Sequence, residues 1–212
     1  MKIAVIGGTR EADLLERALT AANIDVDPNG EIAIVAAHPF DTDLWECAGL
    51  SFANKPHIGL ARPGWAPLET DQWQMAASAE AAALLLKANG AKKALLAVGN
   101  ARLAPFYQLS GVELCVRSRN PPHPPTPPQG TMRVMRGPFD MEGEAAEMRA
   151  QGIDALVVHN AGGTGGWPKL AAARALGIKV ILIERPKLPK MEMVETVEQA
   201  FDWVKRHMGL DD

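Results

Sequence analysis

The sequence predicts an α/β fold of two Rossmann-like domains, with parallel sheets flanked by helices and a ligand cleft between the domains. Short apolar segments alternate with helical ones along the 212 residues, an order typical of parallel sheets built from βαβ units. In addition, a strand, a glycine turn and a helix follow one another near residue 7 and again near residue 162. We therefore predict an N-terminal domain over 1–90 and a C-terminal domain over 91–212.

The N-terminal domain begins with a strand predicted at 2–6, in a sheet covered on both faces. Gly7 and Gly8 allow a tight turn, and Thr9 is a natural N-cap for a helix over 10–22. The Gly-Gly-Thr segment is shorter than the G-x-G-x-x-G fingerprint, so on its own it is a weak indication of dinucleotide binding.

Two later strands of this domain are followed by candidate binding residues. His38 follows the strand predicted at 31–37, and open α/β sheets bind ligands at the carboxyl ends of their strands. A histidine there either donates a proton, binds a carboxylate or is purely structural. Arg62 and Trp65 follow the strand predicted at 55–61. A cation beside an aromatic ring suits a carboxylate arm on a flat molecule, but an ordinary surface loop has the same composition.

The most distinctive stretch follows the strand predicted at 153–158. Four of the five residues from 162 to 166 are glycine, and a helix follows at 169–176. Glycine has no Cβ to keep a phosphate, carboxylate or flat ring off the backbone, and a helix N-terminus attracts anions. A plain turn between strand and helix does not require so many glycines. The predicted ligand contacts in this loop are Asn160, Gly162, Gly163 and Thr164.

Cationic side chains suggest an anionic ligand. Between residues 100 and 139 the charged residues are five arginines and Glu113, without lysine. The planar guanidinium binds carboxylates with two parallel hydrogen bonds, so this window predicts a polyanionic small molecule, although solvated surface charges explain part of it. Arg102 and Arg136 are the candidates within it. Lys169 begins a predicted helix, where a cation opposes the helix dipole unless an anion binds there.

Composition excludes several classes of function. A net charge of −3 argues against nucleic-acid or membrane binding. Cys47 and Cys115 are predicted to be buried structural thiols in a reducing, cytoplasmic compartment. We expect no metal site, no nucleophilic catalytic set and a monomer. The remaining expectations are strands at 91–98, 112–116 and 179–183, a short helix at 101–109, a polyproline-type loop at 120–128 and a terminal amphipathic helix at 194–208.

Taken together, the motifs resemble the precorrin-6A reductase family, which reduces the corrin ring with NADPH in cobalamin synthesis. Singly each motif is weak, but their common order is specific. The matching segments are Gly7-Gly8-Thr9 with Glu11-Ala12, His38-Pro39-Phe40, Arg62-Pro63 with Trp65, Trp73, Gly99 with Leu103 and Phe106, Arg136-Gly137-Pro138-Phe139 with Glu144, Asn160 with Gly162-Gly163, Lys169 with Ala172-Ala173-Arg174, and Arg185-Pro186.

The resemblance implies that NADPH and a tetrapyrrole with several carboxylates share the cleft. Hydride would pass to one C=C bond of precorrin-6A, and a proton to the neighbouring carbon would complete precorrin-6B. It implies cofactor contacts from Glu11 and the two glycine segments, with the proton coming from His38, His159 or water. The substrate contacts would be Arg62, Trp65, Arg102, Arg136 and Lys169.

The chain departs from the family pattern in three places. A strand usually present after the first helix is reduced to about 25–30, which shortens the N-terminal domain and leaves NADH as an alternative cofactor. Ala36-Ala37-His38 stands where the pattern is closer to Asp-Ala-Thr-His, and His159-Asn160-Ala161 where it reads Lys-Asn-Ser. Two alternatives therefore stay open. One is an inactive tetrapyrrole- or nucleotide-binding protein of the same fold, and the other is a different two-domain reductase, such as one acting on flavins or sugar nucleotides.

Overall fold

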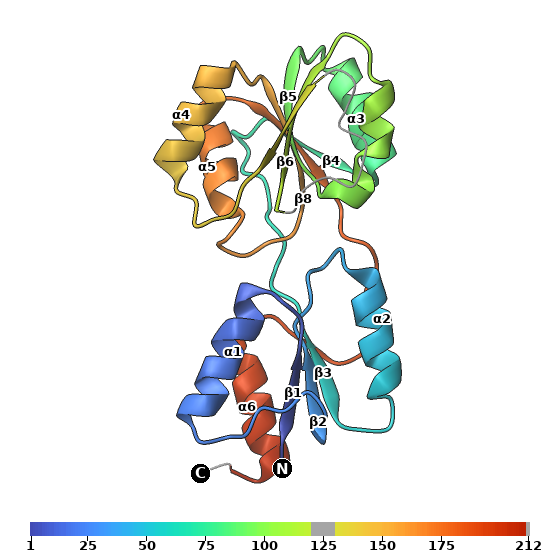
Figure 1. Cartoon of the computed structure of the whole chain (residues 1–212), viewed down its shortest axis with the longest axis vertical. Helices are drawn as coiled ribbons and strands as arrows, with labels where there is room; N and C mark the ends of the chain where they lie inside the picture. Colours follow the sequence, from blue (N-terminus) through green and yellow to red (C-terminus); the bar gives the residue numbers. More distant parts are fainter. Residues whose placement is uncertain (120–129, 211–212) are drawn as a thin grey trace. The chain divides into compact units, whose positions relative to one another are not determined.

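The computed structural model describes residues 1–119 and 130–210, so the loop predicted at 120–128 lies outside the described residues. The chain forms two compact units, drawn in Figure 1. Unit 1 contains Met1–Pro63 and Pro186–Asp212, and unit 2 contains Gly64–Arg185. Each unit is built around one sheet in which every strand pair is parallel. The predicted α/β class with two parallel sheets is therefore confirmed.

Unit 1 has a four-stranded sheet in the order β1-β2-β3-β10. Helices α1 and α6 cover one face and α2 covers the other (Figure 1). Apolar side chains of α1, α6 and the strands, among them Leu15, Ile34 and Trp203, form its main core. The elements are β1 (Ile3–Ile6), α1 (Arg10–Ala21), β2 (Ile32–Val35), α2 (Thr42–Ser51), β3 (His57–Leu60), β10 (Met193–Val194) and α6 (Val197–Met208).

The segment 25–30 lies in part on the free edge of β1. Val26 forms a single parallel bridge with Ile3, and the Ile3 N–H donates to the carbonyl of Asp25 at 2.9 Å. The chain therefore passes to one side of β1 after α1 and returns to the other side as β2. This reversal places the topological switch point of the sheet between β1 and β2, where open α/β sheets bind ligands.

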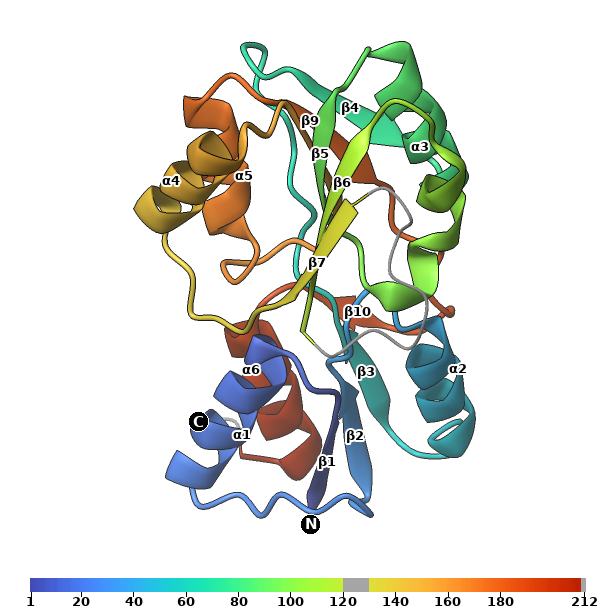
Figure 2. The same ribbon diagram turned by 45° about the horizontal axis from the view of Figure 1, so that its top comes forward.

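Unit 2 has a six-stranded sheet in the order β4-β9-β8-β5-β6-β7. Helices α4 and α5 lie on one face and α3 on the other (Figure 2). The elements are β4 (Trp73–Ala76), α3 (Ala79–Ala88), β5 (Lys93–Ala97), the 3-10 helices η1 (Asn100–Arg102) and η2 (Ala104–Gln108), β6 (Glu113–Ser118), β7 (Gly130–Val134), α4 (Met141–Gln151), β8 (Ala155–His159), α5 (Trp167–Ala175) and β9 (Lys179–Ile183).

The division between the units differs from the predicted boundary at residue 90. Residues 64–90 belong to unit 2 because β4 pairs along its whole length with β9. Residues from 186 onward return to unit 1, where β10 pairs with β3. The strands β4 and β10 are short and lie at sheet edges, so their sequences show little hydrophobic periodicity. Their partners are also distant in the chain, and for both reasons the boundary was not predictable from the sequence.

Other predicted elements agree closely with the structure. The strands predicted at 2–6, 31–37, 55–61, 91–98, 112–116, 153–158 and 179–183 are present as β1, β2, β3, β5, β6, β8 and β9. The helix expected over 101–109 forms instead as two 3-10 helices. The helix expected over 194–208 begins at Val197, after β10. Cys115 is buried as predicted, whereas Cys47 is exposed on α2, so that part of the prediction is wrong. No helix in the described part of the chain is long and apolar enough to cross a membrane.

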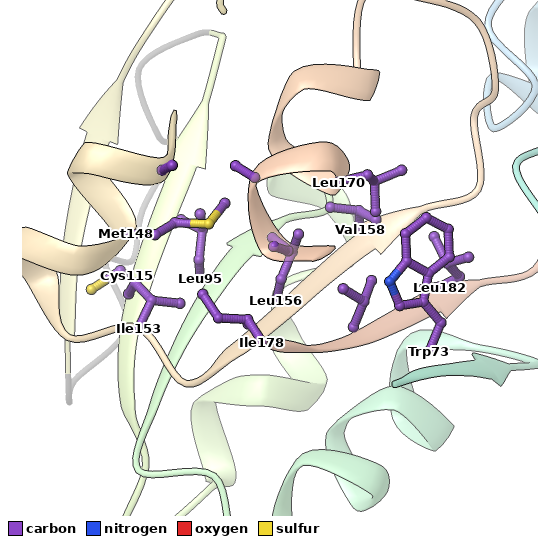
Figure 3. Packing of buried hydrophobic residues seen from close by; sticks show 14 residues of the cluster. Trp73, Leu95, Cys115, Met148, Ile153, Leu156, Val158, Leu170, Ile178 and Leu182 are labelled. Atoms are coloured by element: carbon purple, nitrogen blue, oxygen red, sulfur yellow. The ribbon is translucent and has the colours of Figure 1, made fainter. Parts of the chain in front are cut away.

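One hydrophobic cluster of unit 2 lies between the sheet and helices α4 and α5. Figure 3 shows Leu170 of α5 beside Val158 of β8, and Trp73 of β4 beside Leu182 of β9. Trp73 therefore anchors the edge strand β4 in this core. Arg174 of α5 lies over the ring of Trp73, 4.7 Å from its centroid, and also forms two hydrogen bonds of 2.7 Å with Asp71.

Replacing Asp71 with asparagine is expected to destabilise the protein by about 2 kcal/mol at pH 7, because it removes a charge-assisted pair. The hydrogen bond from Arg174 lowers the pKa of Asp71. A lowered carboxyl pKa stabilises the fold above the unfolded-state value near 4, and this contribution is lost as the pH falls through the lower folded-state pKa. The advantage of the wild type over Asp71→Asn in urea unfolding should therefore shrink below about pH 4. A difference in unfolding free energy between wild type and variant that stays constant down to pH 2 would contradict the ion pair between Asp71 and Arg174.

Candidate functional site

The first candidate site lies at the carboxyl edge of the unit 1 sheet, at the switch point between β1 and β2. The turn after β1 contains Gly7, Gly8 and Thr9, and His38 lies just beyond β2. Gly7, Gly8 and Thr9, which are predicted to bind the cofactor, are therefore close neighbours of His38, which is predicted to be catalytic. Their proximity follows from strand order, since parallel neighbours end at the same edge.

Gly7 is required by the geometry of this turn. Its φ is +141°, and a Cβ placed on it would lie 2.3 Å from the carbonyl oxygen of Ala36 at the end of β2. A Cβ on Gly8 would meet no atom within 4 Å, so backbone at Gly8 is open to an approaching group. The Thr9 hydroxyl donates to the Ala36 carbonyl at 2.6 Å and accepts from the Ala12 N–H at 3.2 Å. Thr9 therefore fixes the turn and caps α1.

The structure pairs two predicted ligand contacts with each other. Arg62, after β3, forms a salt bridge with Glu11 in the first turn of α1. Both side chains are largely buried, at 16% and 17% exposure. A carboxylate at the N-terminus of α1 would repel a phosphate there, and the guanidinium neutralises this charge. We therefore infer that Glu11 and Arg62 balance each other's charge beside the turn at Gly7, instead of binding the cofactor and the substrate separately as predicted.

His38 is held by its own loop. Its Nδ1 accepts a hydrogen bond from the Phe40 N–H at 3.3 Å, and its carbonyl accepts from Trp45 Nε1 at 3.1 Å. An Nδ1 that accepts a hydrogen bond leaves the proton of a neutral imidazole on Nε2. The residue is half-buried.

The second candidate site lies at the carboxyl edge of the unit 2 sheet. The strand order reverses between β5 and β8, and both strands are followed by glycine in the left-handed region. Gly99 follows β5 with a φ of +71°, and Gly162 and Gly163 follow β8 with φ values of +68° and +72°. Both loops at this switch point therefore have backbones that other residues rarely adopt.

The loop after β8, residues 160–166, presents backbone donors. Within residues 1–119 and 130–210, the N–H groups of Gly162, Gly163, Gly165 and Gly166 have no hydrogen-bond acceptor. The loop leads directly into α5, whose N-terminus carries partial positive charge. Successive unpaired N–H groups before a helix are a typical binding site for phosphate or carboxylate.

Asn160 and Trp65 are bound to each other. The Asn160 Oδ1 accepts from the Trp65 N–H at 2.7 Å, and its Nδ2 donates to the Trp65 carbonyl at 3.0 Å. The indole Nε1 of Trp65 donates to the Gly163 carbonyl at 3.0 Å. A Cβ on Gly166 would lie 2.6 Å from the indole, so Trp65 is the flat ring that this glycine admits.

The arginines of the predicted window divide into two groups. Arg117 is buried in salt bridges with Glu144 at 2.6 Å and Glu147 at 2.8 Å, and Arg133 contacts Glu147 at 3.2 Å. These two arginines hold β6 and β7 to α4 and are structural. The others follow strand ends at the carboxyl edge, and they are Arg102 after β5, Arg119 after β6 and Arg136 after β7.

Arg185, two residues after the end of β9, also lies at the carboxyl edge of the unit 2 sheet. It was not among the predicted ligand contacts. Its Nε donates to the Asn160 carbonyl at 2.7 Å. Arg119 was likewise not singled out, and its carbonyl accepts from Arg136 Nε at 3.3 Å. A simple sequence signal would have found both residues, since each arginine stands within two residues of the end of a strand.

Lys169 lies in the first turn of α5, as predicted. Its Nζ lies 5.9 Å from the centre of the Phe139 ring, and it forms no salt bridge with any described residue. Burial lowers the pKa of Lys169, an effect that the nearby charge of Glu144 partly opposes. A largely buried cation at a helix N-terminus is stabilised when an anion binds beside it.

His159 and Thr164 complete the predicted residues. His159 is the last residue of β8 and is half-buried. Thr164 is exposed, and its carbonyl accepts from the Trp167 N–H at 3.3 Å. Among the described residues, no group of three or more metal-binding side chains is present.

Comparison with known proteins identifies the family. Residues 29–205 match the family model "Precorrin-6x reductase CbiJ/CobK". The precorrin-6A reductase of Rhodococcus erythropolis is 37% identical over 94% of this chain and 79% of its own length. That of Rhodobacter capsulatus is 33% identical over 82% of this chain and 70% of its own length.

A solved structure agrees with the sequence matches. A CobK precorrin-6A reductase superposes with a TM-score of 0.87 and 26% identity, covering 98% of this chain and 97% of that one. The two parallel sheets found here are therefore the fold of that enzyme. The chain belongs to the precorrin-6x reductase CbiJ/CobK family, a family of oxidoreductases of cobalamin biosynthesis.

Proposed function

We propose that the chain reduces one C=C bond of precorrin-6A with hydride from NADPH, giving precorrin-6B. The observation that carries this proposal is the row of arginines at the carboxyl edge of unit 2. It lies next to the loop 160–166, where the N–H groups of Gly162, Gly163, Gly165 and Gly166 have no acceptor among the described residues. A tetrapyrrole with acetate and propionate arms needs several bidentate cations around a flat ring, which this edge supplies.

The residues present fit a nicotinamide cofactor. Each unit by itself offers contacts suited to the cofactor. In unit 1 these are Gly7, Gly8 and Thr9, with Glu11 neutralised by Arg62, and in unit 2 they are the glycine N–H groups of the loop 160–166. When bound, NADPH supplies the hydride. The protein orients it, excludes water and compensates the phosphate charges.

The substrate arms would be bound by cations at the carboxyl edge of the unit 2 sheet. Lys169, which has no salt bridge with a described residue, and Arg102 and Arg136, which follow their strands, supply charges for carboxylates. Arg62 and Trp65, also predicted as substrate contacts, are engaged by Glu11 and by Asn160 and Gly163. We therefore give these two residues a supporting role.

A proton must reach the carbon next to the one that receives hydride. His38 carries its neutral-form proton on Nε2, because Nδ1 is an acceptor, so it is suited to donate it. His159 at the end of β8 is the second candidate, and water is the third.

The resemblance to the family implies NADPH rather than NADH. The strand that could supply a residue for the 2′-phosphate, which distinguishes the two cofactors, is however reduced in this chain. In dinucleotide-binding folds the strand after the first helix ends beside the ribose. Here its remnant pairs with Ile3, at the opposite end of β1 from Gly7. A residue that reads the 2′-phosphate must therefore come from another segment.

Anaerobic incubation with precorrin-6A tests the proposal. We expect NADPH absorbance to fall together with a change in the pigment spectrum, and a parallel reaction with NADH gives the preference. Pigment binding without nucleotide oxidation would indicate instead an inactive binding protein of the same fold. Absence of pigment binding would indicate a reductase with another substrate.

A further inference from the structure

We infer that Asn160 is a positioning residue that acts through Trp65, and that it shapes the glycine loop without contacting the ligand. The inference rests on the proposed use of the loop 160–166 for ligand binding. It replaces the direct cofactor contact that the sequence predicts for Asn160. Four features of unit 2 support it.

First, the Asn160 side chain is complementary to the main chain of one distant residue. Its acceptor binds the Trp65 N–H and its donor binds the Trp65 carbonyl, across 95 residues of sequence. Asparagine alone offers both a donor and an acceptor at this length, since aspartate lacks the donor. A Cβ on Gly64 would lie 3.1 Å from the Asn160 Oδ1, so the preceding glycine allows this close pairing.

Second, Asn160 is itself fixed to the sheet. Its N–H donates to the Ile183 carbonyl at 2.9 Å and its own carbonyl accepts from Arg185 Nε at 2.7 Å. The residue is only 8% exposed. A ligand therefore has little access to its side chain, while the rigid sheet gives it a constant position from which to hold Trp65.

Third, the indole of Trp65 connects two points of the loop. Its Nε1 donates to the Gly163 carbonyl at 3.0 Å, and its six-membered ring lies against Gly166. Gly163 lies in the middle of the loop 160–166, and Gly166 is its last residue before α5. The Trp65 side chain therefore fixes the loop at its middle and at its end.

Fourth, holding the Gly163 carbonyl sets the direction of the donors. The carbonyl and N–H of a trans peptide unit point in opposite directions. With the Gly163 carbonyl bound to the indole, the N–H of the same peptide unit, which belongs to Thr164, points away from Trp65. The chain of contacts from Asn160 to Trp65 to Gly163 thus fixes the orientation of this peptide unit, and with it the course of the loop, before any ligand binds, which is how preorganised sites gain affinity.

A double-mutant cycle tests the inference, with NADPH as the probe. Asn160→Ala and Trp65→Ala should each weaken NADPH binding about tenfold, and the double variant should be no weaker than either single variant. Asn89→Ala, which removes a half-buried asparagine side chain from the C-cap of α3, is the matched control and should leave NADPH affinity unchanged. If Asn160 touches the cofactor directly, the two effects should multiply to about 100-fold, which would overturn the inference.

Amide hydrogen exchange on the ligand-free protein separates this inference from the proposed function. Asn160→Ala should speed exchange at least about tenfold at the Trp65 and Trp167 amides, which donate to Asn160 Oδ1 and to the Thr164 carbonyl, while α3 and β5 keep their protection. This result is expected even if the wild type does not bind NADPH, in which case the proposed function alone fails. Unchanged exchange at both amides would overturn the positioning role. Global unfolding in the variant would appear as lost protection in β5 as well, and Trp65→Phe, which keeps the ring and removes the Nε1 donor, would then be measured in its place.

Discussion

Gly7→Ala is expected to destabilise the protein by about 3 kcal/mol and to abolish NADPH binding. The added Cβ would lie 2.3 Å from the Ala36 carbonyl oxygen, and a φ of +141° is a conformation that alanine rarely adopts. The clash is with backbone, so β1 and β2 must separate to relieve it. Urea unfolding and nucleotide titration of the purified variant measure the two effects.

The neighbouring glycine supplies a control for stability. A Cβ on Gly8 meets no atom within 4 Å, and its φ is not positive. Gly8→Ala should therefore change the free energy of unfolding by no more than about 0.5 kcal/mol. Equal destabilisation by the two substitutions would show that the close approach of Gly7 to β2 does not exist in solution.

Lys169→Met is expected to lower kcat/KM for precorrin-6A about 100-fold, through KM more than through kcat. The reason is that Lys169 has no salt bridge among the described residues and lies in the first turn of α5. A substrate carboxylate would then lose its partner. Steady-state kinetics with wild type and variant provide the comparison, and an unchanged KM would remove Lys169 from the substrate site.

The pH dependence of kcat/KM should reveal the same residue. Burial lowers the pKa of Lys169, so its positive charge is lost at a lower pH than that of an ordinary lysine. Affinity for a carboxylate substrate is therefore full below this lowered pKa and falls as the pH rises through it. Lys169→Met should lack this fall, whereas Lys169→Arg should retain affinity to higher pH. If kcat/KM of Lys169→Met still falls at high pH as in the wild type, the fall arises from the titration of another group.

The sequence allowed the strands with strong apolar character to be predicted, because burial on both faces gives each a local signal. β1, β5 and β8 are examples. β4, β7 and β10 were missed, since an edge strand such as Trp73–Ala76 has two exposed central residues and is fixed only by its partner β9. The unit boundary was misplaced for the same reason.

The candidate sites were predicted in part. The turn at Gly7 and the loop after β8 lie at the switch points of their sheets, as glycine after a strand indicated. The sequence could not show that Trp65 accounts for Gly166, because 101 positions separate these residues. Nor could it distinguish Arg117, buried against Glu144, from Arg119 at the strand end two residues later. Such distinctions depend on contacts between distant segments.

The central claim is hydride transfer from NADPH to the corrin precursor. Its most direct test is anaerobic reaction of precorrin-6A with NADPH carrying two deuterium atoms at C4 of the nicotinamide, followed by mass spectrometry of the pigment. We predict one deuterium in precorrin-6B at a carbon-bound position, with equimolar formation of NADP⁺. Reduced pigment without deuterium, or pigment that binds and remains oxidised, would contradict the claim.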